Sequence, residues 1–176
     1  MRVATVAARD VGAALRFDSK FHLSRNNPLL QQLSQAKLPM FSVEQLVRAE
    51  AVWCGNIFTR VYASDEAHGK PLLAPYDVFR YLPWSDKILS RAEVPQFDRL
   101  QIRRGSILLV CSGRNLGPAT IADSFCEQFV MSHDMIRIDG GLSDESIYVA
   151  AFLNTAYGQA LVRTCGSAWK KDPVAG

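Results

Sequence analysis

The chain has 176 residues, of which 48% are hydrophobic, 21% charged and 10% aromatic, the composition of an ordinary globular domain. This composition excludes intrinsic disorder and a disulfide scaffold, and no run of about 18 apolar residues predicts a transmembrane helix. The net charge of +3 permits contact with a polyanion without indicating one. We expect a single domain over residues 1–176, because there is no internal repeat, low-complexity segment or Gly/Ser linker.

Location and redox state also follow from the composition. Residues 1–10 are apolar but short, and Arg9 and Asp10 interrupt them, so we expect no secretory signal and a cytoplasmic protein. The cysteines lie far apart, without a CxxC pair or a histidine at ligand spacing. We therefore expect neither a zinc site nor a redox motif, and neither a metal nor a cofactor.

The first third of the chain predicts an extended segment and two short helices. Residues 16–22 alternate polar and aromatic side chains, as an edge strand or an extended arm does. Pro28 suits the first position of a short helix that reaches Lys37. Ser42 and Gln45 form a capping box that opens the next helical turn.

Strand signals follow in the middle of the chain. Residues 52–53 and 58–62 flank the turn dipeptide Gly55-Asn56, which predicts a hairpin. Residues 71–73 predict a short buried strand, and Pro75 predicts a helical turn that ends before Pro83.

The clearest strand is Ser106–Cys111, a continuous apolar run that we expect to be central in a sheet. Residues 119–121 and 130–138 predict further strands, and residues 144–153 and 156–163 predict helices. The predicted fold class is therefore α+β, with a mixed twisted β-sheet and helices mainly near the C-terminus.

The strand and polar loop around Cys111 are similar to the phosphate loop of low-molecular-weight tyrosine phosphatases. That chemistry needs a thiolate nucleophile and an arginine six positions later to hold the phosphoryl oxygens. Gly117 occupies that position, and Arg114 follows Cys111 by only three residues. A phosphatase-like hydrolase is thus the disfavoured enzyme alternative, and we expect Cys111 to be a buried residue at the end of a strand. No other catalytic set emerges, so we expect a non-catalytic protein.

A set of basic and polar side chains, placed mainly on predicted loops, is the candidate DNA-binding set. Arginine, asparagine and serine suit base edges, and lysine suits phosphates. Any single member is more often an ordinary solvated side chain, so only the set as a whole is indicative. Its members are Arg60, Lys70, Arg80, Lys87, Arg91, Arg104, Ser112, Arg114, Asn115, Lys170 and Lys171.

Several segments also match, in order and spacing, those of a known family. They are Arg16-Phe17-Asp18-Ser19-Lys20-Phe21-His22, Gly69-Lys70-Pro71-Leu72-Leu73, residues 104–113, residues 132–138, residues 148–154 with Tyr157-Gly158-Gln159-Ala160, and Gly166-Ser167. Each motif alone is weak, but together they span nearly the whole chain. The chain resembles a target recognition domain of the specificity subunit of type I restriction-modification systems.

This resemblance implies a non-catalytic α+β domain that docks on double-stranded DNA and reads half of a bipartite site. A separate DNA adenine methyltransferase subunit would carry S-adenosylmethionine and the chemistry. Further implied partners are a restriction subunit with nuclease or translocase activity, and a second recognition domain or a second copy. The chain would correspond to one recognition half without the long spacer helix, and no membrane is involved. A protein-interaction module is the third alternative.

Overall fold

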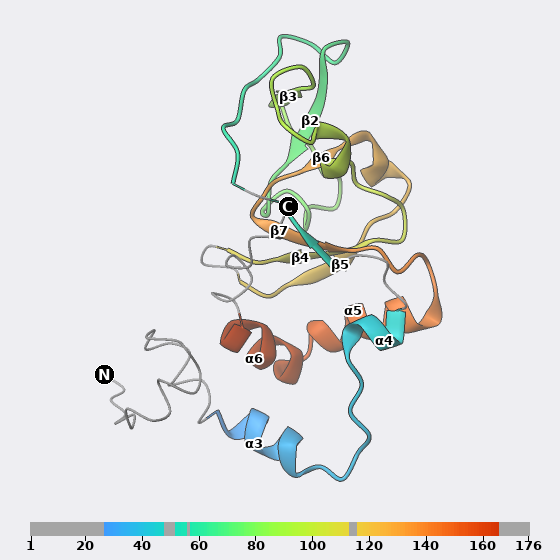
Figure 1. Cartoon of the computed structure of the whole chain (residues 1–176). Coiled ribbons are helices and arrows are strands. Elements are labelled where there is room, and N and C mark those ends of the chain that lie inside the picture. Colours follow the sequence, from blue (N-terminus) through green and yellow to red (C-terminus); the bar gives the residue numbers. More distant parts are fainter. Residues whose placement is uncertain (1–26, 48–51, 56, 113–115, 166–176) are drawn as a thin grey trace, which may run out of the picture.

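The structure is a computed structural model that describes residues 27–47, 52–55, 57–112 and 116–165. The described part combines helices with two β-sheets, which confirms the predicted α+β class (Figure 1). The helices are α3 (Pro28–Gln35), α4 (Val43–Val47), α5 (Asp144–Leu153) and α6 (Ala156–Cys165), with 3-10 helices η1 (Phe97–Leu100) and η2 (Phe125–Gln128). The strands are β1 (Val52–Cys54), β2 (Gly69–Leu73), β3 (Ile88–Ser90), β4 (Ile107–Val110), β5 (Ala119–Ile121), β6 (Val130–Met131) and β7 (Met135–Ile138).

The two sheets differ in topology. The four-stranded sheet has the order β1-β7-β4-β5 and is antiparallel throughout. The three-stranded sheet has the order β3-β2-β6, in which β2 pairs antiparallel with β3 and parallel with β6. Strand β4 has a neighbour on each side, which confirms its predicted central place. Figure 1 shows the three-stranded sheet on one side of the larger sheet and α4, α5 and α6 on the other.

Alternation along β4 explains why its sequence is apolar throughout. Ile107 and Leu109 face a cluster shared with α4, α5 and α6, called the helix-side cluster below. Leu108 joins a second cluster, which is shared with the three-stranded sheet. Strand β7 alternates in the same way, with Ile136 on the helical side and Met135 on the other. Because both faces of this sheet are covered, its inner strands are apolar except at Arg137 of β7, whose guanidinium is paired with Asp139.

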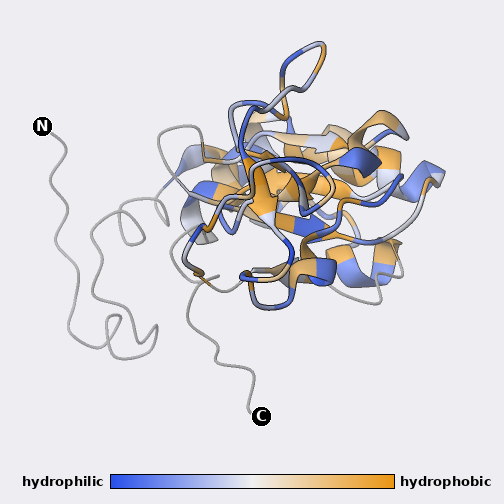
Figure 2. Cartoon of the chain, turned by 90° about the horizontal axis from the view of Figure 1, so that it is seen from above, coloured by the Kyte–Doolittle hydropathy of each residue, from blue (hydrophilic) through white to orange (hydrophobic). Residues whose placement is uncertain are grey.

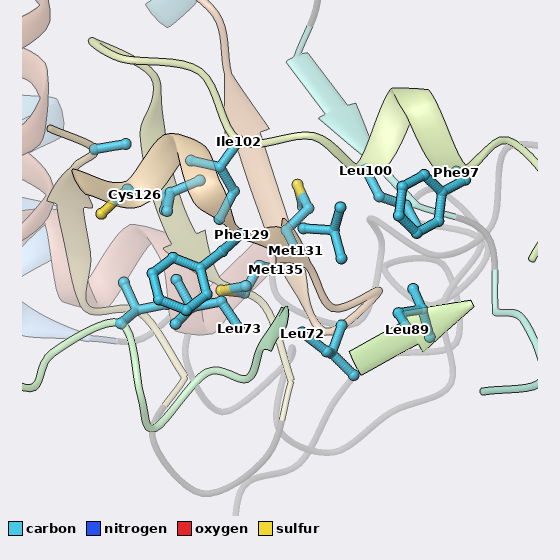
Figure 3. Close-up of a cluster of buried hydrophobic side chains, with 14 of the residues drawn as sticks. Leu72, Leu73, Leu89, Phe97, Leu100, Ile102, Cys126, Phe129, Met131 and Met135 are labelled. Carbon is cyan, nitrogen blue, oxygen red and sulfur yellow. The ribbon is translucent and has the colours of Figure 1, made fainter. Parts of the chain in front are cut away.

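The cluster between the two sheets is the larger of the two (Figure 3). Strands β2 and β6 contribute Leu73 and Met131, and η1 contributes Phe97 and Leu100. Figure 2 shows the hydrophobic residues concentrated inside the described body, whereas its outer loops alternate hydrophilic and hydrophobic residues. No helix among the described residues is long and apolar enough to cross a membrane.

Helix termini follow the local sequence signals. Pro28 opens α3, and Asn27 caps it by accepting the Leu29 N–H at 3.0 Å. The predicted capping box is confirmed: Ser42 N–H donates to Gln45 Oε1 at 2.9 Å, and Gln45 N–H donates to Ser42 Oγ at 3.2 Å. Helix α3 ends at Gln35, short of the predicted end. The strand or arm predicted over 16–22 lies outside the described residues.

The predicted hairpin over residues 52–62 is wrong. Strand β1 pairs with β7 instead, in a register that places Trp53 opposite Arg137. Tyr62 forms only an isolated bridge to Leu89. The pairing of β1 with β7 is more stable than a local hairpin, because it places Trp53 against the buried guanidinium of Arg137 and packs Cys54 against the helix-side cluster.

The single strand predicted over 130–138 is also wrong, because a turn divides it into β6 and β7. Met135 N–H donates to the Ser132 carbonyl at 3.2 Å, and Asp134 N–H donates to Ser132 Oγ at 3.3 Å. These local bonds compete with a continuous ladder. The chain therefore crosses from the three-stranded sheet to the four-stranded sheet at this turn.

Two further predictions near β2 need adjustment. The helical turn predicted after Pro75 consists of hydrogen-bonded turns over residues 75–79 and not of a helix. The sequence does not predict strand β3, because Ile88–Ser90 is too short to show an alternating pattern. It is a strand because it pairs with β2.

A buried arginine links β7 to the end of η1. Arg137 is only 4% exposed, and its Nε donates to the Asp139 carboxylate at 2.9 Å. One Nη donates to the carbonyls of Arg99 at 2.8 Å and Gln101 at 2.6 Å. The guanidinium carbon lies 5.3 Å from the centre of the Trp53 ring. Burial lowers the pKa of Arg137, and the Asp139 carboxylate opposes that shift.

We predict that Arg137→Met lowers the free energy of unfolding by about 3 kcal/mol, because it leaves two carbonyls and a carboxylate without their donor. Arg103→Met is the matched control, since Arg103 lies 3.9 Å from the same Asp139 and its side chain is 65% exposed. It should cost less than about 1 kcal/mol. Urea unfolding followed by tryptophan fluorescence measures both, and equal losses would contradict the assigned role of Arg137.

Candidate nucleic-acid interface

A long loop joins β2 to β3. Its ends are held together, because Pro71 pairs with Ile88 and Leu72 N–H donates to the Lys87 carbonyl at 2.8 Å. Residues 74–87, called the β2–β3 loop below, contain no helix or strand. Connections longer than about 12 residues without secondary structure are uncommon in compact domains and are usually functional.

Three cations of the predicted set meet at this loop. Arg80 and Lys87 from the loop and Arg60 from the preceding segment line one surface hollow of about 240 Å³. Tyr62 and Trp84 line the same hollow, and both are exposed. Basic side chains beside exposed aromatic rings can bind phosphate and stack on bases.

The hollow also contains acidic side chains. Asp77 and Asp86 line it together with the three cations, so its formal charge is only weakly positive. Arg80 Nη2 lies 3.3 Å from Asp77 Oδ1, which holds this guanidinium against the loop. The arrangement therefore offers both donors and acceptors to a ligand.

Asp134, at the turn between β6 and β7, orders the neighbouring polar groups. Arg60 Nη2 donates to Asp134 Oδ2 at 2.9 Å and to Ser132 Oγ at 3.1 Å. Ser112 Oγ donates to Asp134 Oδ1 at 2.5 Å. Two members of the predicted set, Arg60 and Ser112, therefore bind one carboxylate.

Ser112 also begins the loop that follows β4, and both ends of this loop are anchored. On one side Cys111 N–H donates to the Asp134 carbonyl at 3.0 Å. On the other, Gly117 has a φ of +112° and its carbonyl accepts Gln159 Nε2 at 2.7 Å. Arg114 and Asn115 lie outside the described residues, as do Lys170 and Lys171.

The other predicted residues lie elsewhere. Lys70 is half-buried, and its Nζ donates to Gln101 Oε1 at 2.5 Å. The Arg91 guanidinium lies over the Phe97 ring at 5.2 Å. Arg104 is exposed, and its backbone N–H donates to Glu127 at 3.1 Å. None of these three lines the hollow that Arg60, Arg80 and Lys87 share.

Sequence reasoning missed three contributors to this surface: Asp134, Tyr62 and Trp84. Asp134 was noted only as part of a motif, although an aspartate that follows Ser132-His133 is typical of a turn. The available signal for Trp84 was the long stretch without periodicity between residues 73 and 88. Tyr62 offered no signal, because its place depends on the bridge to Leu89.

The glycines and the asparagine of the sequence motifs have structural functions. Gly105 has a φ of +82°, and a Cβ on Gly158 would collide with the Phe152 carbonyl. Asn154 pairs with the open edge of β5, accepting the Ala119 N–H at 3.1 Å and donating to the Ala119 carbonyl at 2.7 Å. These motif residues build the frame that carries the loops.

A second hollow, of about 330 Å³, lies beside Trp53 and Phe58. Its lining includes the carboxylate of Glu93 and Gln96, whose φ is +57°. No member of the predicted set lines it, and its one ionised group repels phosphate. This hollow is therefore not part of the candidate interface.

Cys111 and Cys126 are both buried. Cys111 is 4% exposed and packs in the cluster between the four-stranded sheet and the helices. Burial raises the pKa of the Cys126 thiol to about 11. In the part of the chain that the structure describes, no three His, Cys, Asp or Glu side chains are placed to hold a metal ion.

No known protein family matches the sequence of this chain, and no curated protein matches it.

We predict that Asp134→Ala lowers the free energy of unfolding by about 1–3 kcal/mol, because Ser112 and Arg60 both lose their charged acceptor. Asp98→Ala is the control, since this exposed carboxylate lies 3.9 Å from the Arg91 guanidinium. It should change stability by no more than about 0.5 kcal/mol. Urea titrations of both variants check the difference, and equal effects would show that Asp134 does not organise the site.

Proposed function

We propose that the chain is a recognition domain for double-stranded DNA that directs a separate methyltransferase or restriction complex to its site. The surface that would meet the duplex consists of Arg60, the β2–β3 loop and the start of the loop at Ser112, and is called the contact face below. Loops on a rigid frame are where binding residues are usually found.

One observation carries this proposal. Arg60, from the segment before β2, lines one hollow with Arg80 and Lys87 of the β2–β3 loop and with two exposed aromatic rings. Cations along a duplex replace counterions at the phosphates. The carboxylates of Asp77 and Asp86 supply acceptors, which suit the amino group of cytosine in the major groove. A face that mixes both charges favours selective contact over purely electrostatic binding.

The resemblance of the motifs adds independent support. If these motifs mark a recognition domain, their glycines and asparagine should maintain the frame, while the loops between them vary with the DNA target. Gly105, Asn154 and Gly158 do lie at frame positions. The methyltransferase subunit that carries S-adenosylmethionine, a restriction subunit and a second recognition domain are proposed partners, and the cytoplasm is the proposed location.

A phosphatase-like hydrolase fits less well. Its nucleophile would be Cys111, whose side chain is buried among the aliphatic side chains of the helix-side cluster. Gly117 also lacks the guanidinium that phosphoryl transfer needs.

A protein-interaction module is the second candidate function, and one observation favours it. Exposed aromatic residues gather in the β2–β3 loop, including Tyr76, Phe79 and Trp84. Such side chains are frequent anchors at protein interfaces. The cations beside them are the reason to prefer DNA.

We predict that the full chain binds a short mixed-sequence duplex with an affinity that falls steeply between about 50 mM and 200 mM salt. The double variant Arg80→Ala/Lys87→Ala should weaken binding and reduce the salt slope by roughly two units, because each of the two cations neutralises one phosphate in the parent protein. Fluorescence anisotropy titrations at several salt concentrations measure both.

Arg163→Ala serves as the matched control, because Arg163 is an exposed cation in the last turn of α6, on the helical side of the larger sheet. Its salt slope should equal that of the parent. Selection from a library of random duplexes should enrich one sequence. A folded chain that binds no duplex at low salt would overturn the proposed function, and enrichment of no sequence would overturn its recognition role.

A further inference from the structure

Two neighbouring side chains project from the β2–β3 loop into solvent. Tyr81 is 99% exposed and Leu82 is 65% exposed. Arg80 precedes them and Trp84 follows two residues later, and both of these line the hollow of about 240 Å³. The exposed pair therefore lies at the rim of the contact face. Isolated exposed apolar residues are common, but a contiguous group on one long loop indicates a binding role.

The base of this projection is held in place. Val78 is buried in the cluster between the sheets, and Asp77 N–H donates to the Ala74 carbonyl at 2.9 Å. Arg80 N–H donates to the Asp77 carbonyl at 3.1 Å, and Pro83 restricts the backbone on the far side. The backbone on either side of the pair is therefore restrained before binding, which lowers the entropic cost of ordering it.

Charge indicates which partner the pair meets. The pair directly follows Arg80, which lines the hollow with Arg60 and Lys87. With Asp77 and Asp86 counted, the hollow keeps a weakly positive formal charge, which favours a polyanion. Duplex DNA offers phosphates to the cations and, a few ångströms away, stacked bases to the apolar side chains. Proteins that insert apolar side chains between base pairs unstack the step and kink the duplex.

We propose that Tyr81 and Leu82 form a wedge that inserts between two base pairs of the bound duplex, unstacks that step and bends the DNA. This inference rests on the proposed function and adds a mode of binding to it. Steps that unstack at low cost, TA and CA/TG, are the expected insertion points. The phosphates on either side of the step face Arg80 and Lys87.

The test uses the full chain and duplexes that carry 2-aminopurine, a base analogue whose fluorescence rises when it is unstacked, with fluorophores at both ends to report bending. The parent protein should raise the 2-aminopurine signal and shorten the end-to-end distance at saturating protein. Tyr81→Ser/Leu82→Ser should abolish both changes and weaken binding by about tenfold, the effect expected when one side chain no longer stacks on a base. The salt slope should stay that of the parent, because the cations that face the phosphates are unchanged.

The matched control is Ile147→Ser/Tyr148→Ser, since this pair is also adjacent and exposed but lies on α5. It should unstack and bend the duplex as the parent does. Thermal unfolding establishes that both variants fold.

The outcomes separate the two proposals. A parent that binds no duplex overturns the proposed function and the wedge with it. A parent that binds duplex without unstacking, or a Tyr81/Leu82 variant that unstacks as well as the parent, overturns the wedge alone. If the parent self-associates in size-exclusion chromatography and the Tyr81/Leu82 variant does not, while DNA binding is unchanged, the wedge is overturned and the pair belongs to a protein interface.

Discussion

The buried guanidinium of Arg137 is the interaction on which the rest of this fold depends. It lies on the face of β7 that meets the three-stranded sheet, where an uncompensated charge would be very costly. The carbonyls of Arg99 in η1 and of Gln101 just after it, together with the Asp139 carboxylate, satisfy it. Gln101 extends these contacts to the three-stranded sheet. Its Oε1 accepts a hydrogen bond from the Lys70 amine of β2, and its Nε2 donates to the Phe129 carbonyl. This polar chain holds the two sheets in one relative position.

The fixed arrangement of the sheets gives the long exposed β2–β3 loop its anchor points. The β2–β3 loop starts and ends on paired strands, and the buried side chain of Val78 ties its middle to the core. Its cations and aromatic rings can therefore hold a defined geometry without secondary structure of their own. Across the turn between β6 and β7, Asp134 adds Arg60 and Ser112 to the same surface. The sheets and helices, which form the frame, are thus distinct from the contact face. A few hydrogen bonds and ion pairs, such as those of Asp134, connect the two.

This division changes how the sequence motifs should be interpreted. Gly105 and Gly158 occupy positions that a side chain would strain or block, and Asn154 completes an open strand edge. Such residues indicate how the sheets and helices are built, and they do not indicate which ligand the domain binds. Under the proposed function, the residues that determine specificity are those of the loops, where exposed side chains change without cost to the core. Lys70 illustrates the point, because it belonged to the predicted DNA-binding set yet its amine is engaged in the link between the sheets.

The sequence by itself determined the elements whose signals are local: the caps of α3 and α4, the apolar run of β4, the helices α5 and α6, and hence the α+β class. It also identified Arg60, Arg80 and Lys87 as candidates. Only the tertiary structure decided that β1 pairs with β7, that residues 130–138 turn between two sheets, and that these three cations meet beside Tyr62 and Trp84. The physical reason is that strand partners and shared surfaces depend on side chains far apart in the chain, whose burial together outweighs local preference.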